Sequence, residues 1–350
     1  MQKKLSIMLP VYNMELYIDD CLRSLVKQSW EDDVEIIIID DGSVDASTEI
    51  CQKYSSKYKY IKLYRKENGG VASARNMALQ YASGEYFYWV DPDDYIADDF
   101  WQKISSVLQQ GYDFIFFDFV YFSENVQSKK CFGNQSSFIE KKELIRLFAD
   151  GMKMASHLPT KIIKKSLWEG ISFPEGISLC EDYAVLTYIV PKVKSAFYLH
   201  ESLYNYRQHA GSICHNVSVR DVHIVHQLVK NRYKHFLQKG FDVDILGILF
   251  AEYEYLKVIV FKENISENIE KYQGIYKEML EHLRKNKTIL LKCDSFGNKD
   301  KFMLYLLFLD MRPALYLLLR GWDVLKQIRK IKKRRFMTAA LDKLAIFDKS

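Results

Sequence analysis

Three carboxylates lie within four residues directly after a run of aromatic residues: Asp91, Asp93 and Asp94. Carboxylates this close repel one another at the end of a buried strand unless a cation or a strong set of donors compensates them. Hard oxygen ligands at this spacing suit Mg²⁺ or Mn²⁺. A cap for a helix that starts near residue 97 is an alternative, but capping needs one carboxylate and this segment supplies three. We therefore expect a metal site here.

An aromatic ring and a carboxylate follow two other predicted strands. Tyr12 comes after the strand predicted over 5–9, and Asp41 comes after the strand predicted over 34–39. On adjacent loops, a ring can stack against a base and a carboxylate can accept the N–H of that base, which would suit uracil. Each residue alone is a weak indication, because Asp-Gly-Ser segments are common in turns and helix caps. The pair favours a nucleotide-binding edge.

Two glycines and an arginine follow the third predicted strand, where Asn68, Gly69 and Gly70 lead to Arg75. Glycines let the backbone approach a ligand closely, and Arg75 would project from the next helix toward the same edge of the sheet. The spacing is not that of the GxGxxG fingerprint, and no Walker lysine follows. Dinucleotide-binding proteins and P-loop proteins are therefore disfavoured. A tight turn with a solvated arginine is the alternative.

Two further polar segments come later in the chain. Glu181 and Asp182 open a predicted helix. Either carboxylate could serve only as a cap, but one that faces the metal could act as a general base on a hydroxyl group. Arg207 and His209 lie in a polar and aromatic stretch and are candidate diphosphate contacts, although a surface loop explains them nearly as well. The histidines form no zinc-binding pair of the HxxxH or HExxH type.

The elements that must position these side chains alternate over the first 120 residues. Apolar strands are predicted over 5–9, 34–39, 60–64, 85–90 and 113–119, and helices over 15–28, 45–57, 72–82 and 97–110. This alternation indicates an α/β fold with a parallel sheet covered on both faces. Ligands of such sheets bind at the carboxyl ends of the strands. Later helices are predicted near 140–150, 181–190, 218–238, 243–263 and 266–286.

Composition narrows the class of protein. The 350 residues are 48% hydrophobic and 27% charged, which is typical of a folded chain with a well-formed core. The six cysteines form no CxxC pair, which disfavours zinc and disulfide scaffolds and favours a reduced, cytosolic protein. The first apolar run is too short for a signal peptide. The apolar stretch 302–319 is interrupted by Asp310, Arg312 and Pro313, so we expect no conventional membrane span.

The formal charge of +5 is unevenly distributed. Residues 321–350 hold nine Lys and Arg against three Asp and Glu, so the rest of the chain is close to neutral. A nucleic-acid groove would spread basic residues over a folded domain, so we expect no nucleic-acid partner. With apolar residues among its charges, the tail over about 300–350 favours an amphipathic helix that binds an anionic membrane surface. A helical subdomain or a contact in a homo-oligomer is the alternative.

Taken in order, the motifs resemble those of a family 2 glycosyltransferase with a GT-A fold. They are Pro-Val-Tyr-Asn at 10–13, Asp-Asp-Gly-Ser at 40–43, Asn-Gly-Gly at 68–70 with Arg75, the acidic segment 91–94, Glu-Asp at 181–182 and Tyr-Arg at 206–207. The conjunction of six motifs is more specific than any one of them. Pro92 stands where the family more often has a small polar residue, but it leaves both flanking carboxylates available.

The resemblance implies a fold and an activity. The fold is a GT-A domain over 1–215, a Rossmann-like and mostly parallel sheet with flanking helices, followed by a helical region over 216–350. The activity is that of an inverting enzyme that moves a hexosyl or N-acetylhexosaminyl group from a nucleotide-sugar donor, UDP-linked, to a glycan acceptor carried on a polyprenyl lipid. The product would be capsule, exopolysaccharide or another cell-surface glycan, made at the cytoplasmic face of the cell membrane with Mn²⁺ or Mg²⁺. Alternatives are a non-catalytic subunit of a glycan-assembly complex and a sugar nucleotidyltransferase.

The resemblance also implies a role for individual residues. The donor nucleotide would be bound by Pro10, Val11, Tyr12, Asn13, Asp41, Asn68, Gly69, Arg75 and Asp91, and the metal by Asp91 and Asp93. Asp94 and Glu181 would contact the donor sugar or the acceptor, and Asp182 would be the catalytic base.

Overall fold

The computed structural model describes residues 3–30, 33–123, 126–150, 156–177, 180–209, 219–243, 245–261, 265–293 and 297–319. The chain divides into two compact units, Met1–Gly247 and Ile248–Ser350. The first unit continues past residue 215, and the predicted boundary at 215 stays a prediction. The basic tail from residue 320 onward lies outside the described residues.

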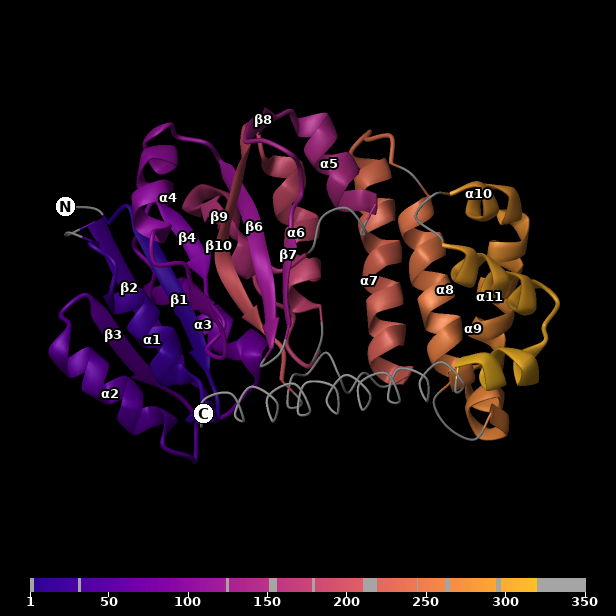
Figure 1. Ribbon diagram of the computed structural model, residues 1–350, viewed down its shortest axis with the longest axis horizontal. Coiled ribbons are helices and arrows are strands. Elements are labelled where there is room, and N and C mark those ends of the chain that lie inside the picture. The colour runs from indigo at the N-terminus through magenta and orange to yellow at the C-terminus, as the bar shows by residue number, and fades with distance from the viewer. Residues whose placement is uncertain are drawn as a thin grey trace, which may run out of the picture. The chain divides into compact units, whose positions relative to one another are not determined.

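A mixed sheet forms the centre of the first unit (Figure 1). Its strands in the described residues are β1 (Leu5–Val11), β2 (Val34–Asp40), β3 (Ile61–Arg65), β4 (Tyr86–Trp89), β5 (Tyr95–Ile96), β6 (Phe114–Ser123), β7 (Val126–Lys130), β8 (Ser137–Ile139), β9 (Lys161–Lys164) and β10 (Ala196–Arg207). The order is β3-β2-β1-β4-β9-β6-β10-β5, with β7 paired to β6 and β8 to β10. The five predicted strands are confirmed as β1, β2, β3, β4 and β6.

One strand near the middle of the sheet, β9, runs antiparallel to both of its neighbours. β3, β2, β1 and β4 are mutually parallel, and β9 runs antiparallel between β4 and β6. β2 shows why the parallel half forms, because its seven residues are all buried and four of them are consecutive isoleucines. Such an unbroken β-branched run suits a strand that is covered on both faces.

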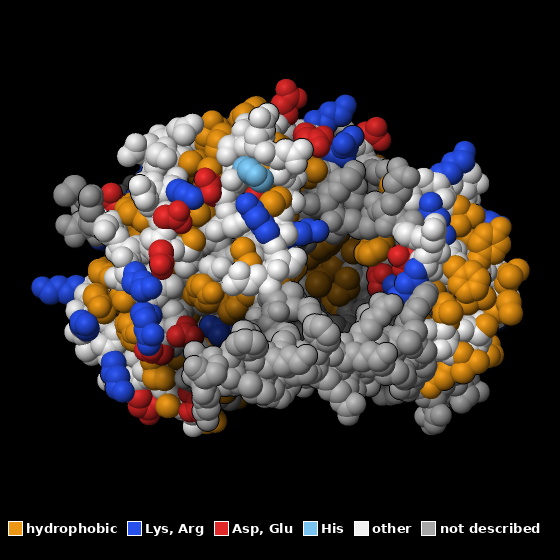
Figure 2. Space-filling view, viewed as in Figure 1, with side chains coloured by type: hydrophobic (Ala, Val, Ile, Leu, Met, Phe, Trp, Pro, Cys, Tyr) orange, Lys and Arg blue, Asp and Glu red, His pale blue; other side chains and the backbone are white. Residues whose placement is uncertain are grey.

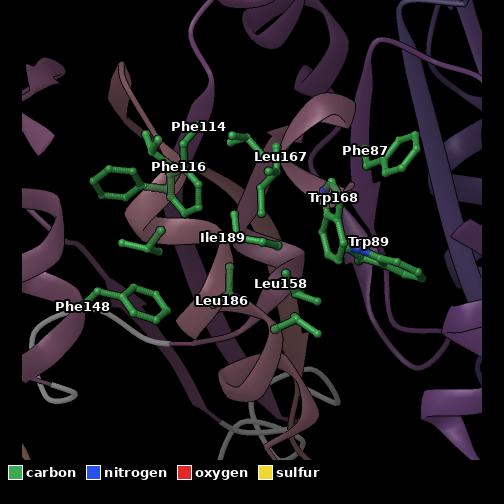
Figure 3. Packing of buried hydrophobic residues seen from close by; sticks show 14 of the residues in the cluster. Phe87, Trp89, Phe114, Phe116, Phe148, Leu158, Leu167, Trp168, Leu186 and Ile189 are labelled. Atoms are coloured by element: carbon green, nitrogen blue, oxygen red, sulfur yellow. The ribbon is translucent and has the colours of Figure 1, made fainter. Parts of the chain in front are cut away.

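Helices cover both faces of the sheet. They are α1 (Ile18–Val26), α2 (Ser47–Lys57), α3 (Val71–Tyr81), α4 (Phe100–Gln109), α5 (Lys141–Asp150), α6 (Glu181–Ile189) and α7 (Val219–Gln238), with 3₁₀ turns η2 (Leu158–Thr160), η3 (Lys165–Trp168) and η4 (Val190–Lys192). α1 and α4 pack with Ile7 on one face. α3, α5 and α6 pack with Met8 on the other face, where Leu186 and Ile189 lie near Trp168 (Figure 3). The helices predicted for this unit are confirmed.

The described part of the second unit is helical. It contains α8 (Leu246–Phe261), whose first residues belong to the first unit, α9 (Ile265–Lys285), α10 (Lys287–Lys292), α11 (Asn298–Phe308) and a further helical stretch over 312–319. Tyr253 Oη donates to Asp300 Oδ1 (2.8 Å), which ties α8 to α11. Measured over the described residues, each helix is too short or too polar to span a bilayer.

Replacement of Leu186 by alanine tests the packing of α6 on the sheet. Leu186 is fully buried in α6, so Leu186→Ala should lower the free energy of unfolding by about 2–5 kcal/mol through the cavity that it leaves. Leu237→Ala, at an exposed position of α7, should change it by less than about 0.5 kcal/mol. Urea unfolding of both variants provides the measurement. Equal effects would contradict this packing.

Candidate active site

The loops that follow β1 and β2 are interlocked. The N–H of Asp41 donates to the carbonyl of Val11 (2.8 Å). The N–H of Asn13 donates to Ser43 Oγ (3.1 Å), and Asn13 has a φ of 53°, a left-handed conformation that asparagine tolerates. These contacts leave the ring of Tyr12 exposed. The predicted aromatic ring is therefore accessible at the carboxyl edge of the sheet.

The carboxylate of Asp41 organises the loop that follows β3. It accepts the N–H of Gly69 (3.0 Å) and the N–H of Gly70 (2.7 Å), and Lys66 Nζ lies 2.8 Å from it. Gly70 has a φ of 83°, which favours glycine at this position. Lys66 was not among the predicted residues, and its only signal in the sequence is its place directly after a strand. A contact between Asp41 and a base stays a prediction.

Arg75 is the centre of the acidic residues. It projects from α3, is 3% exposed, and its Nη2 lies 3.1 Å from Asp91 Oδ1. Its Nη1 contacts both carboxylates that open α6, Glu181 Oε1 at 2.6 Å and Asp182 Oδ1. Burial alone would lower the pKa of Arg75, but these carboxylates outweigh burial and raise it. The structure thus places Arg75 among carboxylates, a pairing that the sequence did not predict, and its contact with a nucleotide stays a prediction.

The pKa values of Asp91 and Glu181 are raised although Arg75 lies beside both carboxylates. Burial raises the pKa of Asp91 to about 7, with Arg75 lowering it and the charge of Asp93 raising it further. Burial likewise raises the pKa of Glu181. Negative charge at this edge therefore exceeds the positive charge that compensates it, which is the condition under which a divalent cation binds favourably.

Asp94 supports the end of β10. It is 2% exposed, its Oδ2 accepts from Tyr204 Oη (2.7 Å), and its Oδ1 accepts the N–H of Arg207 (2.7 Å). Burial and the charges of Asp93 and Asp91 raise its pKa well above the usual range. Tyr204 also accepts the N–H of Asp91 (3.1 Å), a link that the sequence analysis missed because Tyr204 lies in a strand more than 100 residues later. A contact between Asp94 and a sugar stays a prediction.

Arg207 and His209 are brought to the acidic segment 91–94. Arg207 Nε donates to the carbonyl of Asp93 (2.8 Å), and its Nη2 donates to Asp20 Oδ2 (3.1 Å). His209 Nε2 lies 3.0 Å from Asp93 Oδ2, and its ring packs on Tyr17 with centroids 4.6 Å apart. Both predicted side chains therefore lie beside Asp93, whereas their contact with a diphosphate stays a prediction.

Asp182 is held from two sides at the start of α6. Its Oδ1 contacts Arg75, and its Oδ2 accepts the N–H of Leu158 (3.0 Å). Cys180, directly before the helix, has a φ of 64°. Two fixed donors orient the carboxylate without covering it completely, since 15% of its side chain is exposed. This geometry suits a residue that accepts a proton from a bound hydroxyl group.

A second group of potential metal ligands comes from β6, from β10 and from the residue that follows β7. The ligand atoms of Asp118, Cys131 and His200 lie within 4.8 Å of one another. Asp118 Oδ1 accepts from Tyr198 Oη (2.7 Å), and His200 Nδ1 lies 2.9 Å from Asp118 Oδ2. Tyr198 and His200 already contact this carboxylate, and we assign no ion to the group.

The family model for glycosyl transferase family 2 matches residues 6–166. This chain carries a family 2 glycosyltransferase domain. The match extends from β1 to β9 and includes Tyr12, Asp41, Arg75 and the acidic segment 91–94. Asp182 lies beyond the matched residues.

Relatives of this glycosyltransferase domain come from bacteria. Glycosyltransferase GlyG of Streptococcus pneumoniae is 27% identical over 262 residues, which are 72% of this chain and 86% of GlyG. Minor teichoic acid biosynthesis protein GgaB of Bacillus subtilis is 29% identical over 58% of this chain and 23% of GgaB. Poly(ribitol-phosphate) beta-glucosyltransferase of Bacillus spizizenii is 34% identical over 51% of this chain and 28% of that protein. The chain thus spans a minor part of the last two relatives.

A solved structure shares the fold. Residues 1–349 of S. aureus TarS, in complex with UDP-GlcNAc, match with a TM-score of 0.66 at 21% identity over 91% of this chain and 92% of that one. The predicted fold class is confirmed, since the chain has the GT-A fold, followed by C-terminal helices. In its sheet, β1, β2, β3, β4, β6 and β10 run in one direction, and the other described strands run in the opposite one.

Replacement of Asp91 by asparagine tests the excess of negative charge. The pKa of Asp91 is near 4 in the unfolded chain and about 7 in the folded one. Proton uptake by this carboxyl group therefore contributes fully to stability below about pH 4, and the contribution is lost as the pH rises through about 7. Without divalent cations, Asp91→Asn should therefore have a Tm a few degrees above that of the unmodified chain at pH 8, and the gain should shrink toward pH 4.

Asp98→Asn is the matched control, because the Asp98 side chain is 81% exposed. Its Tm should follow that of the unmodified chain at every pH. A Tm of Asp91→Asn below that of the unmodified chain at pH 8 would contradict the charge excess.

Proposed function

We propose that this chain is an inverting glycosyltransferase that moves a sugar from a nucleotide-sugar donor to a hydroxyl group of a glycan acceptor. The observation that carries the proposal is the carboxylate cluster around Arg75, which joins Asp91 after β4 to Asp182 at the start of α6. It lies in a chain with a family 2 domain. The relatives named for teichoic acid and poly(ribitol-phosphate) chemistry support a cell-surface glycan as the product.

We assign a divalent cation, Mn²⁺ or Mg²⁺, to Asp91 and Asp93. The described carboxylates here are Asp91, Asp93, Asp94, Glu181 and Asp182. The guanidinium of Arg75 contacts three of them, whereas Arg207 donates its backbone N–H to Asp94 and its Nε to the backbone carbonyl of Asp93. Carboxylate oxygens are the ligands that these ions prefer, so the donor set fits. When bound, the ion would neutralise charge on the departing diphosphate. Arg207 and His209, beside Asp93, are the further candidates for diphosphate contacts.

The donor is proposed to be UDP-linked. Tyr12 offers an exposed ring for stacking, and the Asp41 carboxylate shapes the loop on the neighbouring strand end. Pro10 and Val11 end β1, and Asn13, Asn68 and Gly69 lie in these two loops. The TarS structure contains UDP-GlcNAc, which supports a hexosyl or N-acetylhexosaminyl group as the transferred sugar.

Asp182 is the proposed base. Its carboxylate, oriented by Arg75 and by the N–H of Leu158, would take the proton of the acceptor hydroxyl as that oxygen attacks the anomeric carbon. The bond between the anomeric carbon and the diphosphate oxygen breaks on the opposite side, so a single displacement inverts the configuration. Glu181 and Asp94, which flank this region, are the candidates for sugar contacts.

An apolar surface in the second unit supports a membrane location at the cytoplasmic face, with a polyprenyl-linked acceptor. We name it the apolar patch: Ile289, Phe302, Tyr305, Leu309, Met311 and Leu317, which are 43–69% exposed. Figure 2 shows hydrophobic side chains gathered over α10 and α11. On α11, Phe302 and Tyr305 are exposed whereas Leu304 and Leu307 are buried, so the helix has apolar residues on its outer face as well as its inner one.

The charges around the apolar patch favour an anionic lipid surface as its partner. Lys287 Nζ lies 4.9 Å from the ring centroid of Tyr305, and residues 285–319 hold six Lys and Arg against three Asp. A second copy of the chain would bring two cationic rims together, whereas anionic headgroups complement them. Aromatic and aliphatic side chains beside lysines are typical of surfaces that insert into the membrane interface.

Replacement of Asp182 tests the proposed activity. Purified chain is assayed for sugar transfer with Mn²⁺ and a panel of UDP-, GDP- and TDP-linked donors, and transfer from a UDP-linked donor is expected. Asp182→Asn should lower kcat at least about 100-fold, because a general base contributes about that much, while the Kd for the donor stays the same. Asp182→Asn with unchanged kcat would contradict the base assignment, and failure of every donor would contradict the proposed activity.

Replacement of two residues of the apolar patch tests the membrane proposal. The double variant Phe302→Gln and Leu309→Gln should float less than the unmodified chain with vesicles of phosphatidylcholine and phosphatidylglycerol. Leu237→Gln, at an exposed apolar position of the first unit, should float as well as the unmodified chain. Equal flotation of all three proteins would overturn this assignment. So would flotation of the unmodified chain with pure phosphatidylcholine vesicles that equals its flotation with the mixed vesicles.

A further inference from the structure

One peptide group lies between a buried lysine and the carboxylate of Asp182. Lys161 begins β9, is 1% exposed, and its Nζ donates to the carbonyl of His157 (2.8 Å). The N–H of Leu158 belongs to the same peptide group and donates to Asp182 Oδ2 (3.0 Å). A chain of two hydrogen bonds therefore runs from an ammonium group through a single peptide to a carboxylate.

We propose that Lys161 is a positioning residue for Asp182 and acts through the peptide between His157 and Leu158. The proposal rests on the proposed function, in which Asp182 is the base. Hydrogen bonds in a chain polarise one another. The ammonium group draws electron density toward the carbonyl oxygen, which makes the N–H at the other end a stronger donor. That N–H then favours the ionised carboxylate, which is the form that accepts a proton.

The local structure holds this peptide in place. Thr160 Oγ1 donates to the same carbonyl of His157 (3.0 Å) and accepts from Lys161 Nζ (2.9 Å). The ring of His157 stacks on Tyr206, with centroids 5.4 Å apart and planes at 17°. Burial lowers the pKa of His157 to about 4, so its ring is neutral near pH 7. These contacts restrict rotation of the peptide and add no second charge to it.

Lys161 and Arg75 act on different oxygens of the Asp182 carboxylate. Burial lowers the pKa of Lys161 to about 7, the charge of Asp182 raises it, and Arg232 lowers it. On its other side Asp182 faces Arg75 and, next to it, Glu181. Asp182 thus lies between one cation in direct contact and a second cation that acts through a peptide group.

Lys161→Met removes the ammonium group and keeps most of the side-chain volume. We expect kcat for sugar transfer to fall about tenfold, which is typical for the loss of a residue that orients another functional residue. The KM for the donor should not change. In the plot of kcat against pH, the acidic limb should move to higher pH. The reason is that the Asp182 carboxylate loses the influence of the Lys161 ammonium group, which favours its ionised form. A loss of stability alone would not move that limb.

Lys165→Met is the matched control. It removes the same charge four residues along the chain, where Lys165 Nζ donates to the carbonyl of Ala82 (3.2 Å), and should keep the kcat and the pH profile of the unmodified chain. Lys161→Arg should return the acidic limb toward its original position. If Lys161→Met does not fold, Thr160→Val takes its place, since it removes one partner of the same carbonyl and should shift the limb in the same direction.

Two outcomes separate this inference from the proposed function. Absence of sugar transfer by the unmodified chain would contradict the proposed function. Transfer by the unmodified chain together with an unshifted acidic limb in folded Lys161→Met, or in Thr160→Val where that variant is used, would overturn the role of Lys161 and leave the proposed function standing.

Discussion

A single buried guanidinium holds the acidic residues of this glycosyltransferase domain together. Arg75 contacts Asp91, Glu181 and Asp182 at once. Three carboxylates without this cation, or this cation without the carboxylates, would carry the large cost of an uncompensated buried charge. Because the arginine comes from α3 and its partners follow β4 and open α6, the ion cluster also sets where these three elements meet. One arginine does not balance all of the charge, and this imbalance makes the edge of the sheet suitable for a metal ion.

The antiparallel strand β9 brings the remaining parts of the site to this edge. It is inserted between β4 and β6, with Lys161 paired to Phe116. The turn η2 that precedes it therefore lies beside the start of α6, where the N–H of Leu158 reaches Asp182. Parallel strands bring the residues that follow them to the carboxyl edge of the sheet. Because β9 runs in the opposite direction, it brings the residues that precede it, those of η2, to this same edge.

Local patterns in the sequence were sufficient for β1, β2, β3, β4, β6 and the helices of the first unit, but not for β5, β7, β8, β9 and β10. Unbroken apolar runs identified β1, β2 and β4, and polar residues directly after them, such as Asp41 and Asp91, lie at the carboxyl edge as expected for this fold. The pairing of Arg75 with Glu181 and Asp182 could not be predicted, because it joins residues more than 100 positions apart. Lys161 was missed for the same physical reason, since a lysine at the start of a short strand is ordinarily solvated.

Binding of Mn²⁺ by the unmodified chain, with and without UDP, tests the central claim most directly. If the carboxylates around Arg75 form a metal-dependent nucleotide-sugar site, calorimetry should show one Mn²⁺ bound per chain, with a lower Kd in the presence of UDP. The same ion should be lost in Asp93→Ala. Equal Mn²⁺ binding by the unmodified chain and by Asp93→Ala, or no effect of UDP on it, would contradict the claim.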